Sequence, residues 1–287
     1  MKITIKDKQK CDIFVNIFQC LKLYSEHINI HVTNDKFVTS GLDRSHVSFY
    51  DLNIHKDWFD EYELDEFEQP VIGINSSIMF KILHTKQENQ TLSMEYAEGD
   101  DRLKLSFISE DIKDINNFFE MPLVDIDVDN IQVPKKEGEA EFIIPTKKFC
   151  VVMEQLGIFD DVFRMICTDE GVNCIVDGTE GKMDIAMSLD TMIEYSIDED
   201  TTVENNYSTK LINKVCNFNK ISPNINLSIC NNYPIEIKYC LGTSASAAET
   251  GSANAGDIDA DADAADTDAD DKASYMRFLI APQIDND

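Results

Sequence analysis

Positive charge is scarce in this sequence. Its 287 residues include 25 Lys and Arg against 54 Asp and Glu, which gives a formal net charge of −29. A chain with this balance repels nucleic acid as a whole, because phosphate binding is an electrostatic attraction. Residues 242–274 alone hold nine acidic residues and one lysine, but the remainder is still strongly acidic. Any contact with DNA therefore requires the basic residues to gather on one surface.

Long apolar runs and export signals are also missing. No apolar stretch approaches the roughly 18–20 residues that cross a bilayer. The first ten residues, MKITIKDKQK, lack the apolar stretch of a secretory signal. We therefore expect neither a membrane protein nor a secreted one. The 43% of hydrophobic residues suffices for a sizeable core in one large domain or two smaller ones.

Motifs that carry chemistry are absent as well. None of the eight cysteines forms a CxxC pair, and the five histidines show no metal-ligand spacing. In a chain without a secretory signal, we expect reduced thiols that act as small core residues, with no disulfide framework. No nucleophile elbow, phosphate loop or dinucleotide fingerprint occurs. The sequence thus predicts no enzyme activity, no metal and no cofactor.

An internal repeat is the most informative feature that is present. At an offset of 135 residues, Phe14 matches Phe149, Leu21 matches Leu156 and Thr33 matches Thr168. Apolar positions continue to match at an offset of 133–135 through residues 78–94 and 211–229. The matches keep apolar character more than identity, as a duplicated fold would.

Each half of the repeat shows the same order of elements. Apolar residues at helical spacing predict helices over residues 12–24, 76–84, 146–156 and 209–217. Alternating patterns predict strands over 27–33, 47–54, 91–96, 104–108, 164–168, 182–189, 226–229, 235–240 and 275–280. Two helices and many antiparallel strands in each half indicate an α+β fold.

Two segments stand apart from these elements. Residues 122–139 contain Pro134 and the charged run KKEGEAE, which favours an extended linker. Residues 242–274 are rich in Ala, Asp, Ser, Gly and Thr, so we expect a disordered loop between two strands. Asp257, Asp259 and Asp261 are spaced like the start of a calcium loop, but the sixth position is Ala262 and the twelfth Asp268. A solvated acidic tether is the preferred interpretation.

Four stretches resemble the proliferating cell nuclear antigen family, the sliding clamps of DNA replication. Residues 41–48 (GLDRSHVS) are similar to that family's MDSSHVS segment. Residues 121–134 (MPLVDIDVDNIQVP) resemble its interdomain connector, MKLMDLDVEQLGIP, without a gap. Residues 279–285 (LIAPQID) resemble its C-terminal LAPKIE. Residues 232–235 (NYPI) lie where the family has a proline on a surface loop.

The resemblance implies a two-domain subunit, three of which close head to tail into a ring around duplex DNA. The expected parts are an N-terminal clamp domain over residues 1–120, a connector over 121–139 and a C-terminal clamp domain over 140–287 that contains the 242–274 insertion. Each domain would pack two helices on antiparallel sheets. The subunit interface would pair a strand near residues 111–119 with one near 181–189 of the next subunit. The protein would lie in the nucleus or, if viral, at the site of viral DNA replication.

The resemblance further implies that the helices line the channel and present basic side chains to phosphates without reading bases. The candidates on and around the helices are Lys22, Lys81, His84, Lys86, Lys147, Lys148, Lys210, Lys214 and Lys220. The family often has basic residues where this sequence has Val15, Asn16, Val151 and Glu154. Contact with DNA should therefore be weak and mobile. Without the resemblance, the preferred interpretation would be that these lysines lie on ordinary solvent-exposed helix faces.

Client proteins of this family carry a short peptide whose 3₁₀ turn fills an apolar pocket beneath the connector. The matching positions are Leu42, His46, Val47, Ile131, Val133, Pro234, Leu279, Ile280, Ala281 and Pro282. The alternative is that these residues only pack the core or the strands. Leu279 stands where the family commonly has Tyr, so client preference can differ.

The function expected from the resemblance is a processivity factor that tethers DNA polymerase, a clamp loader and other replication or repair proteins. Two other functions stay open on the sequence. One is a checkpoint-type or non-ring clamp homologue, which solution mass would reveal. The other is an acidic scaffold or DNA mimic, suggested by the net charge of −29.

Overall fold

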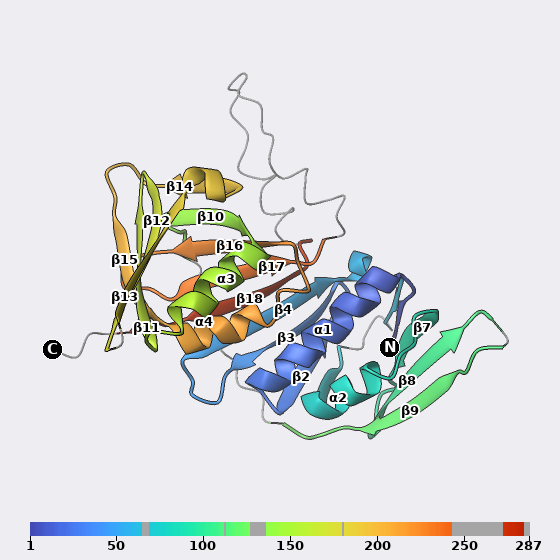
Figure 1. Cartoon of the computed structure of the whole chain (residues 1–287). Helices are drawn as coiled ribbons and strands as arrows, with labels where there is room; N and C mark the ends of the chain where they lie inside the picture. Colours follow the sequence, from blue (N-terminus) through green and yellow to red (C-terminus); the bar gives the residue numbers. More distant parts are fainter. Residues whose placement is uncertain (65–68, 112, 127–135, 180, 243–271, 284–287) are drawn as a thin grey trace, which may run out of the picture.

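The computed structural model describes residues 1–64, 69–111, 113–126, 136–179, 181–242 and 272–283 (Figure 1). The first half contains β1 (Lys2–Ile5), α1 (Lys8–Tyr24), β2 (His27–Val32), β3 (Lys36–Leu42), β4 (Ser48–His55), η1 (Lys56–Trp58), β5 (Glu61–Glu63), β6 (Val71–Asn75), α2 (Ser76–Leu83), β7 (Gln90–Glu95), β8 (Arg102–Ser109) and β9 (Asn117–Pro122). The second half contains β10 (Ala140–Pro145), α3 (Thr146–Leu156), β11 (Val162–Thr168), β12 (Gly171–Gly178), β13 (Gly181–Ser188), η2 (Leu189–Thr191), β14 (Glu194–Ile197), β15 (Val203–Ser208), α4 (Thr209–Cys216), β16 (Asn224–Ile229), β17 (Ile235–Cys240) and β18 (Tyr275–Ile280).

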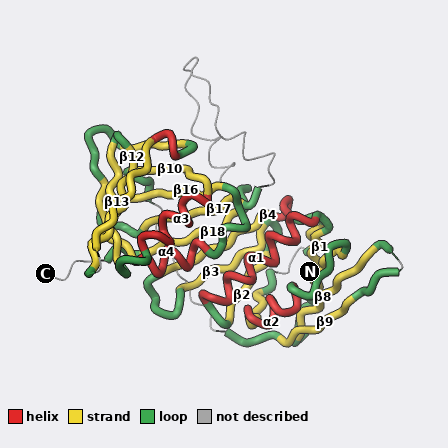
Figure 2. Tube along the Cα trace, in the orientation of Figure 1, coloured by secondary structure: helices red, strands yellow, loops and turns green. Residues whose placement is uncertain are grey.

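The two element lists match one to one, which confirms the repeat. α2 and α4 begin 133 residues apart, as do β4 and β13 and the two 3₁₀ turns. All strand pairings among the described residues are antiparallel, in sheets ordered β5-β1-β7-β8-β9, β14-β10-β16-β17-β18-β4-β3-β2-β6 and β13-β12-β11-β15. Figure 2 shows these strands wrapped around the four helices, which is the predicted α+β, two-domain architecture.

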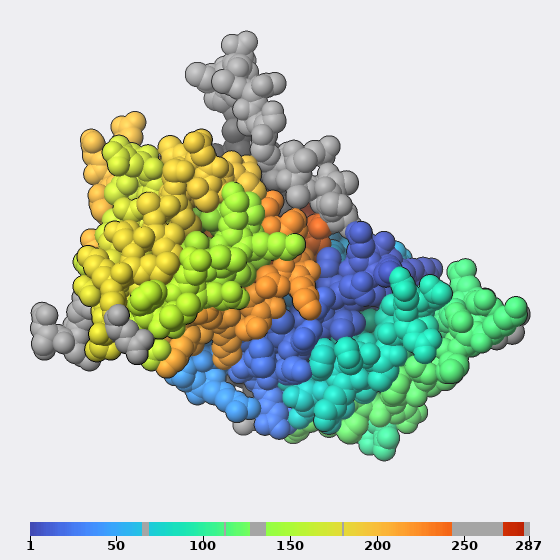
Figure 3. Space-filling view, in the orientation of Figure 1, coloured from blue at the N-terminus to red at the C-terminus, as the bar shows by residue number. Residues whose placement is uncertain are grey.

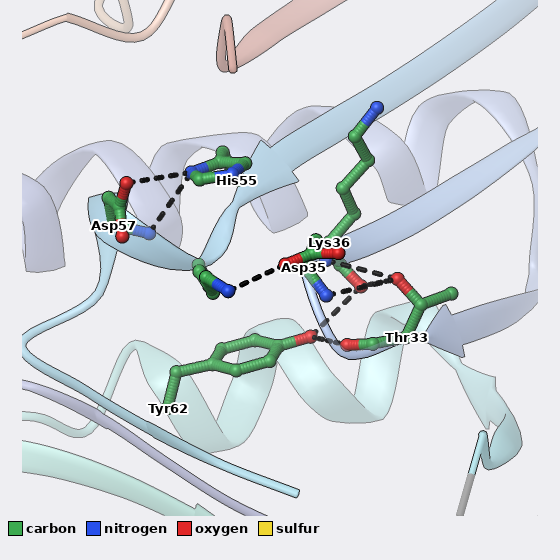
Figure 4. A network of polar contacts seen from close by, with 7 residues as sticks. Thr33, Asp35, Lys36, His55, Asp57 and Tyr62 are labelled. Atoms are coloured by element: carbon green, nitrogen blue, oxygen red, sulfur yellow. Dashed lines mark hydrogen bonds and ion pairs between the residues drawn. The ribbon is translucent and has the colours of Figure 1, made fainter. Parts of the chain in front are cut away.

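Each half contains a tyrosine whose hydroxyl makes the same hydrogen bonds to a strand turn, and we call this arrangement a tyrosine latch. The Tyr62 hydroxyl donates to the carbonyls of Thr33 and Lys36, at 2.7 and 2.9 Å, and closes the β2–β3 turn (Figure 4). In the second half, the Tyr195 hydroxyl donates to the carbonyls of Thr168 and Gly171 in the β11–β12 turn. Burial raises the pKa of both phenols, that of Tyr195 to about 12. These latches fix which residues of the two halves are equivalent.

The two halves are joined by main-chain pairing. β18 from the end of the chain pairs with β4 from its start, with Phe278 opposite Tyr50 and Ile280 opposite Ser48. Beneath this junction, the rings of Tyr24 and Phe278 lie 5.2 Å apart, and those of Phe218 and Phe278 lie 4.7 Å apart. One continuous nine-stranded sheet therefore crosses from one half to the other.

The first helix begins at Lys8, four residues before the predicted start. The Asp7 side chain accepts from the Lys10 N–H and caps the helix, so the polar residues after it join the first turn. Asn75 and Ser208 cap α2 and α4 in the same way. The described helices are too short or too polar to cross a membrane.

The cysteines mostly serve the core, as expected. All eight are unpaired, and seven are buried, with Cys240 exposed. Burial raises the pKa of Cys11 to about 11, so this thiol stays protonated at neutral pH. The described residues contain no group of His, Cys, Asp and Glu arranged to hold a metal ion. The possible calcium loop at Asp257–Asp261 lies outside the described residues.

Most of the predicted loop over residues 242–274 also lies outside the described residues, but its two flanks are described. Cys240 pairs with Tyr275, the Leu241 N–H donates to the Ser274 carbonyl at 2.8 Å, and the Trp58 indole donates to the Leu241 carbonyl. The described flanks of the segment are thus held together by strand pairing and hydrogen bonds of their own.

We expect that replacing residues 243–272 with a four-residue turn keeps the fold. Shortening this connection about eightfold lowers the entropy cost of loop closure, which corresponds to about 2 kcal/mol of added stability. Urea unfolding of the deletion variant and the full chain measures the difference. Loss of cooperative unfolding in the variant would show that the segment contributes to the fold.

Candidate functional site

The four helices share one face of the molecule (Figure 3). They carry eight lysines against two acidic residues, Asp12 and Glu154. The rest of the chain has 17 Lys and Arg against 52 Asp and Glu. The helices are therefore richer in basic residues than the rest of the chain, which favours contact with a polyanion on the face that they share.

The predicted DNA-facing residues differ in solvent exposure and in their contacts with neighbouring side chains. Lys81, His84, Lys147, Lys148, Lys210 and Lys220 are exposed, whereas Lys22, Lys86 and Lys214 are half-buried. The Lys22 ammonium lies 3.8 Å from the centre of the Phe80 ring, and that of Lys210 lies 2.5 Å from Asp161. Lys147 and Lys148 lie in the first turn of α3, directly after Thr146, and have no ion-pair partner within the described residues.

Lys214 faces the junction between the halves. Its ammonium lies 3.8 Å from the Asp43 carboxylate and 4.1 Å from the centre of the Tyr24 ring. Burial, chiefly, together with nearby Arg44, lowers the pKa of Lys214 against the opposing pull of Asp43. This lysine ties α4 of the second half to the β3–β4 turn of the first.

Asp43 organises that turn from a buried position. Its carboxylate accepts from the Ser45 hydroxyl at 2.6 Å and from the Val47 and Ser48 N–H groups at 3.1 and 3.0 Å. His46, next in the turn, has a φ of 58°, a left-handed conformation that these bonds hold in place. Burial works to raise the pKa of Asp43, but the hydrogen bonds and Lys214 outweigh it and hold the pKa below its usual value.

Replacing Asp43 with Asn should lower the free energy of unfolding by about 2 kcal/mol at neutral pH, because charge-assisted bonds become neutral ones. A carboxylate with a lowered folded-state pKa stabilises the protein above its unfolded pKa of about 3.9 and loses this effect as pH falls through the folded value. Urea titrations of both proteins should therefore show a gap that closes as pH falls below about 4. A gap that does not vary with pH would contradict the assignment.

Several predicted client-binding residues gather where β3 and β18 end and β4 begins, in the middle of the nine-stranded sheet and on the face away from the helices. Leu42 of β3 lies opposite Phe49 of β4, and Phe49 lies opposite Leu279 of β18. The Ala281 N–H donates to the carbonyl of Val47, whose side chain is 40% exposed. We name this surface the outer patch: Leu42, Val47, Phe49, Leu279 and Ala281.

Phe49 was missed by the sequence analysis. It is 8% exposed and stands between two predicted residues, Leu42 and Leu279. The alternation along β4 could have indicated it, since Val47 and Phe49 share a face. Ile280 points to the opposite face and is completely buried in the core, so it supports the strand rather than the patch. His46 is exposed, and Pro234 and Pro282 are half-buried.

The first described residues of the predicted connector lie against β6 and β2 (His27–Val32). After β9 ends at Pro122, the Val124 N–H donates to the Gly73 carbonyl, and the Asn29 amide donates to the Ile126 carbonyl at 3.3 Å. A Cβ on Gly73 would lie 2.0 Å from the Val124 carbonyl oxygen, so only glycine permits this approach. Ile131 and Val133 lie outside the described residues.

The other end of the connector is anchored in the second half. The Glu139 carboxylate accepts from the Asn231 N–H and side-chain amide, both at 3.1 Å, and the Cys230 thiol donates to the Glu137 carbonyl. The Asn231 N–H, chiefly, and Lys136 keep the pKa of Glu139 below its usual value. Both described ends of the connector are therefore held by hydrogen bonds, one in each half of the chain.

Among the described residues, the strands that end a sheet, and so have one edge without a partner strand, are β5, β9, β6, β14, β13 and β15. β9 ends the five-stranded sheet and β13 ends the four-stranded sheet, and they lie at opposite ends of the molecule (Figure 1). β9 begins at Asn117, later than the predicted strand near 111–119. The Asp114 N–H donates to the Asp111 carbonyl, and the Asp114 carboxylate accepts from the Ser109 hydroxyl, so the chain turns before the strand begins. Phe118 on β9 is 72% exposed.

Comparisons with known proteins agree with this architecture. Residues 6–131 match the family model for the proliferating cell nuclear antigen N-terminal domain, and residues 132–248 match that for its C-terminal domain. Proliferating cell nuclear antigen of Chaetomium thermophilum is 20% identical over 284 residues, which cover 97% of each chain. Proliferating cell nuclear antigen 2 of Drosophila melanogaster is 22% identical over 199 residues, which cover 69% of this chain and 77% of the relative. The chain belongs to the proliferating cell nuclear antigen family.

Proposed function

We propose that this protein is a sliding clamp, a non-enzymatic ring that encircles duplex DNA and tethers DNA polymerase and other replication or repair proteins. The observation that carries the proposal is the pairing of β18 with β4 inside the chain. By the repeat, the equivalents of these strands are β9 and β13, and both have a free edge. A second copy of the chain can therefore form, between subunits, the junction that this chain forms within itself.

The internal junction also supplies the register of the proposed interface. Tyr62 and Tyr195 occupy equivalent positions in the two halves. Following the paired residues across the neighbouring strands leads from Tyr62 to Phe119 in the first half and from Tyr195 to Phe278 in the second, so Phe119 and Phe278 are equivalent. Phe278 lies opposite Tyr50, and the equivalent of Tyr50 on β13 is Met183. Phe119 would thus lie opposite Met183 of the next subunit.

Two features support this register. Phe119 and Met183 are half-buried apolar residues that already pack against the edge of their own cores. One residue further along, Glu120 would lie opposite Lys182 of the next subunit, which places opposite charges across the interface. We propose a homotrimer, since three two-domain subunits give the six-domain ring of this family.

Absolute mass by light scattering, measured across concentration, tests ring formation. The proposal predicts a mass near three times 32.6 kDa at micromolar concentration. A monomer at every concentration would overturn the self-closing ring and favour a heteromeric or non-ring clamp. Retention on circular but not linear DNA then separates a clamp from an acidic DNA mimic, which would instead compete with DNA for a DNA-binding partner.

The helical face would line the channel of the ring, with the exposed lysines on phosphates and no base contacts. We expect Lys147→Glu with Lys148→Glu to weaken DNA binding by about tenfold at low salt, because two phosphate contacts are replaced by repulsion. The magnitude of the salt slope of log K should fall by about two. Fluorescence anisotropy with a short duplex measures both. Exchange of Lys113 and Lys272, which lie off the helices, for Glu is the matched control; an equal loss there would indicate diffuse attraction.

The outer patch is proposed as the site for client peptides. A short peptide could insert apolar residues into the patch and pair its main chain with that of the connector. Polymerase, the clamp loader and repair proteins are the proposed partners, and no cofactor is proposed.

A further inference from the structure

The surface around β14 has no role in the proposed ring or client site. β14 is the end strand of the nine-stranded sheet and pairs only with β10 among the described residues. A hollow of about 730 Å³ extends from β14 across the outer face of β10, β16 and β17. A second hollow, of about 520 Å³, runs along β14 toward η2 and Asp169. Both hollows include Glu194, Tyr195 and Ser196, so the free edge of β14 lies between two concave surfaces.

The charged residues that line these hollows are mostly acidic. Glu141, Glu194 and Glu236 line the larger hollow and Asp169 lines the smaller one, and Lys238 is the one basic residue that lines either. Glu236 is 3.6 Å from Arg277, and Lys238 lies over the Tyr275 ring at 4.8 Å. Glu194 has no ion-pair partner among the described residues and is exposed. The edge therefore offers uncompensated negative charge.

Apolar surface accompanies the charge along the same strand. Ile193, directly before β14, is 51% exposed, and Ile197 at its other end is half-buried. Leu189 is also exposed, but it follows β13 directly and would lie near the ring interface. Along β14, apolar residues alternate with Glu194 and Ser196, which face the larger hollow.

We propose that β14 is a docking edge for an extended basic peptide of a partner protein, which adds to the sheet as a tenth strand. Main-chain hydrogen bonds to a free strand edge give affinity, and alternate side chains give specificity. Basic side chains of the peptide would lie on the outer face near Glu194 and Glu141. Apolar side chains, one residue apart from them, would pack beside Ile193 and Ile197. The fitting partner thus has alternating apolar and basic residues.

The test uses the full chain and a fluorescent ten-residue peptide of alternating valine and lysine, at physiological salt. A peptide of alternating serine and lysine has the same charge without the apolar side chains. Glu194→Lys reverses charge at the edge, and Ile193→Ser removes the apolar contact there. Glu98→Lys makes the same charge change on the exposed β7–β8 turn and serves as the control.

We expect the valine–lysine peptide to bind, with the dissociation constant raised about tenfold by Glu194→Lys and by Ile193→Ser, and unchanged by Glu98→Lys. Amides of β14 should gain protection from hydrogen exchange in the complex. Ala281→Asp, in the outer patch, should leave this binding intact. Absence of binding, equal binding of the serine–lysine peptide, or equal weakening by Glu194→Lys and Glu98→Lys would overturn the proposal.

Discussion

Replacing Phe119 with Ala should convert the trimer into monomers. In the proposed register, the Phe119 ring covers Met183 of the next subunit, and its loss removes about 2 kcal/mol of apolar contact from each interface. A closed trimer contains three copies of that interface, so the assembly would lose about 6 kcal/mol, or more than 10,000-fold in its association constant. Light scattering should fall from three chain masses to one at micromolar concentration.

Two controls separate this effect from damage to the fold. Ile108→Ala truncates an exposed residue of similar character on the neighbouring strand β8 and should leave the trimer intact. Because Phe119 also contacts Phe107, with ring centroids 5.5 Å apart, Phe119→Ala is checked for cooperative unfolding. A trimer that persists in a folded Phe119→Ala variant would contradict the β9–β13 interface.

Charge reversal at Glu120 and Lys182 tests the proposed register of β9 with β13 more directly. Glu120→Lys or Lys182→Glu alone should weaken the trimer, since each places like charges opposite one another. Together they should restore most of the loss. Exposed pairs contribute only about 0.5–1 kcal/mol each, but the threefold repetition makes the effect measurable as a shift in the dissociation midpoint. Without rescue in the double variant, the strands would have to pair in another register.

The second large effect is expected at the outer patch. Ala281→Asp places a carboxylate beside Val47, where a bound peptide would exclude water. Burying an unpaired charge costs several kcal/mol, so affinity for a client peptide should fall at least about 100-fold. Anisotropy with a fluorescent peptide that carries two adjacent phenylalanines in a 3₁₀ turn measures this loss.

The matched control lies at the other end of the same strand. Ala273→Asp makes the identical change just before β18, and Ala281→Asp just after it. Ala273→Asp should not alter peptide affinity, and neither change should alter the trimer mass. Equal affinity of the Ala281→Asp variant and the unmodified protein would place the client site elsewhere.

Some of the fold followed from local sequence. The four helices and several strands were predicted to within a few residues because their apolar residues recur at helical or strand spacing. β17 and β18 were placed at their observed bounds even though about thirty residues separate them. Short or two-sided strands such as β5 and β14 were not identified, because three or four residues carry too little periodicity. The start of α1 was missed because its first turn is polar and depends on the Asp7 cap.

In the candidate site too, some residues could be predicted from the sequence and others only from the structure. Local resemblance placed most of the outer patch, but Phe49 needed the pairing of β4 with both β3 and β18 to become visible. Lys214 reads as a free helix lysine in the sequence, whereas packing turns it toward Asp43, 171 residues earlier in the chain. Such long-range contacts leave no periodic signal in either segment.

The sequence by itself determined the duplicated α+β architecture, the absence of catalytic motifs and the family, because periodicity and local motifs survive without knowledge of contacts. Only the tertiary structure decided where the charges and edges lie. Folding brings the four helices, which carry eight lysines, to one face of a chain with a net charge of −29, and it leaves one edge of β9 and one edge of β13 without a partner strand at opposite ends. The physical reason is that charge segregation and strand order are properties of chain packing, which brings together residues that are far apart in sequence.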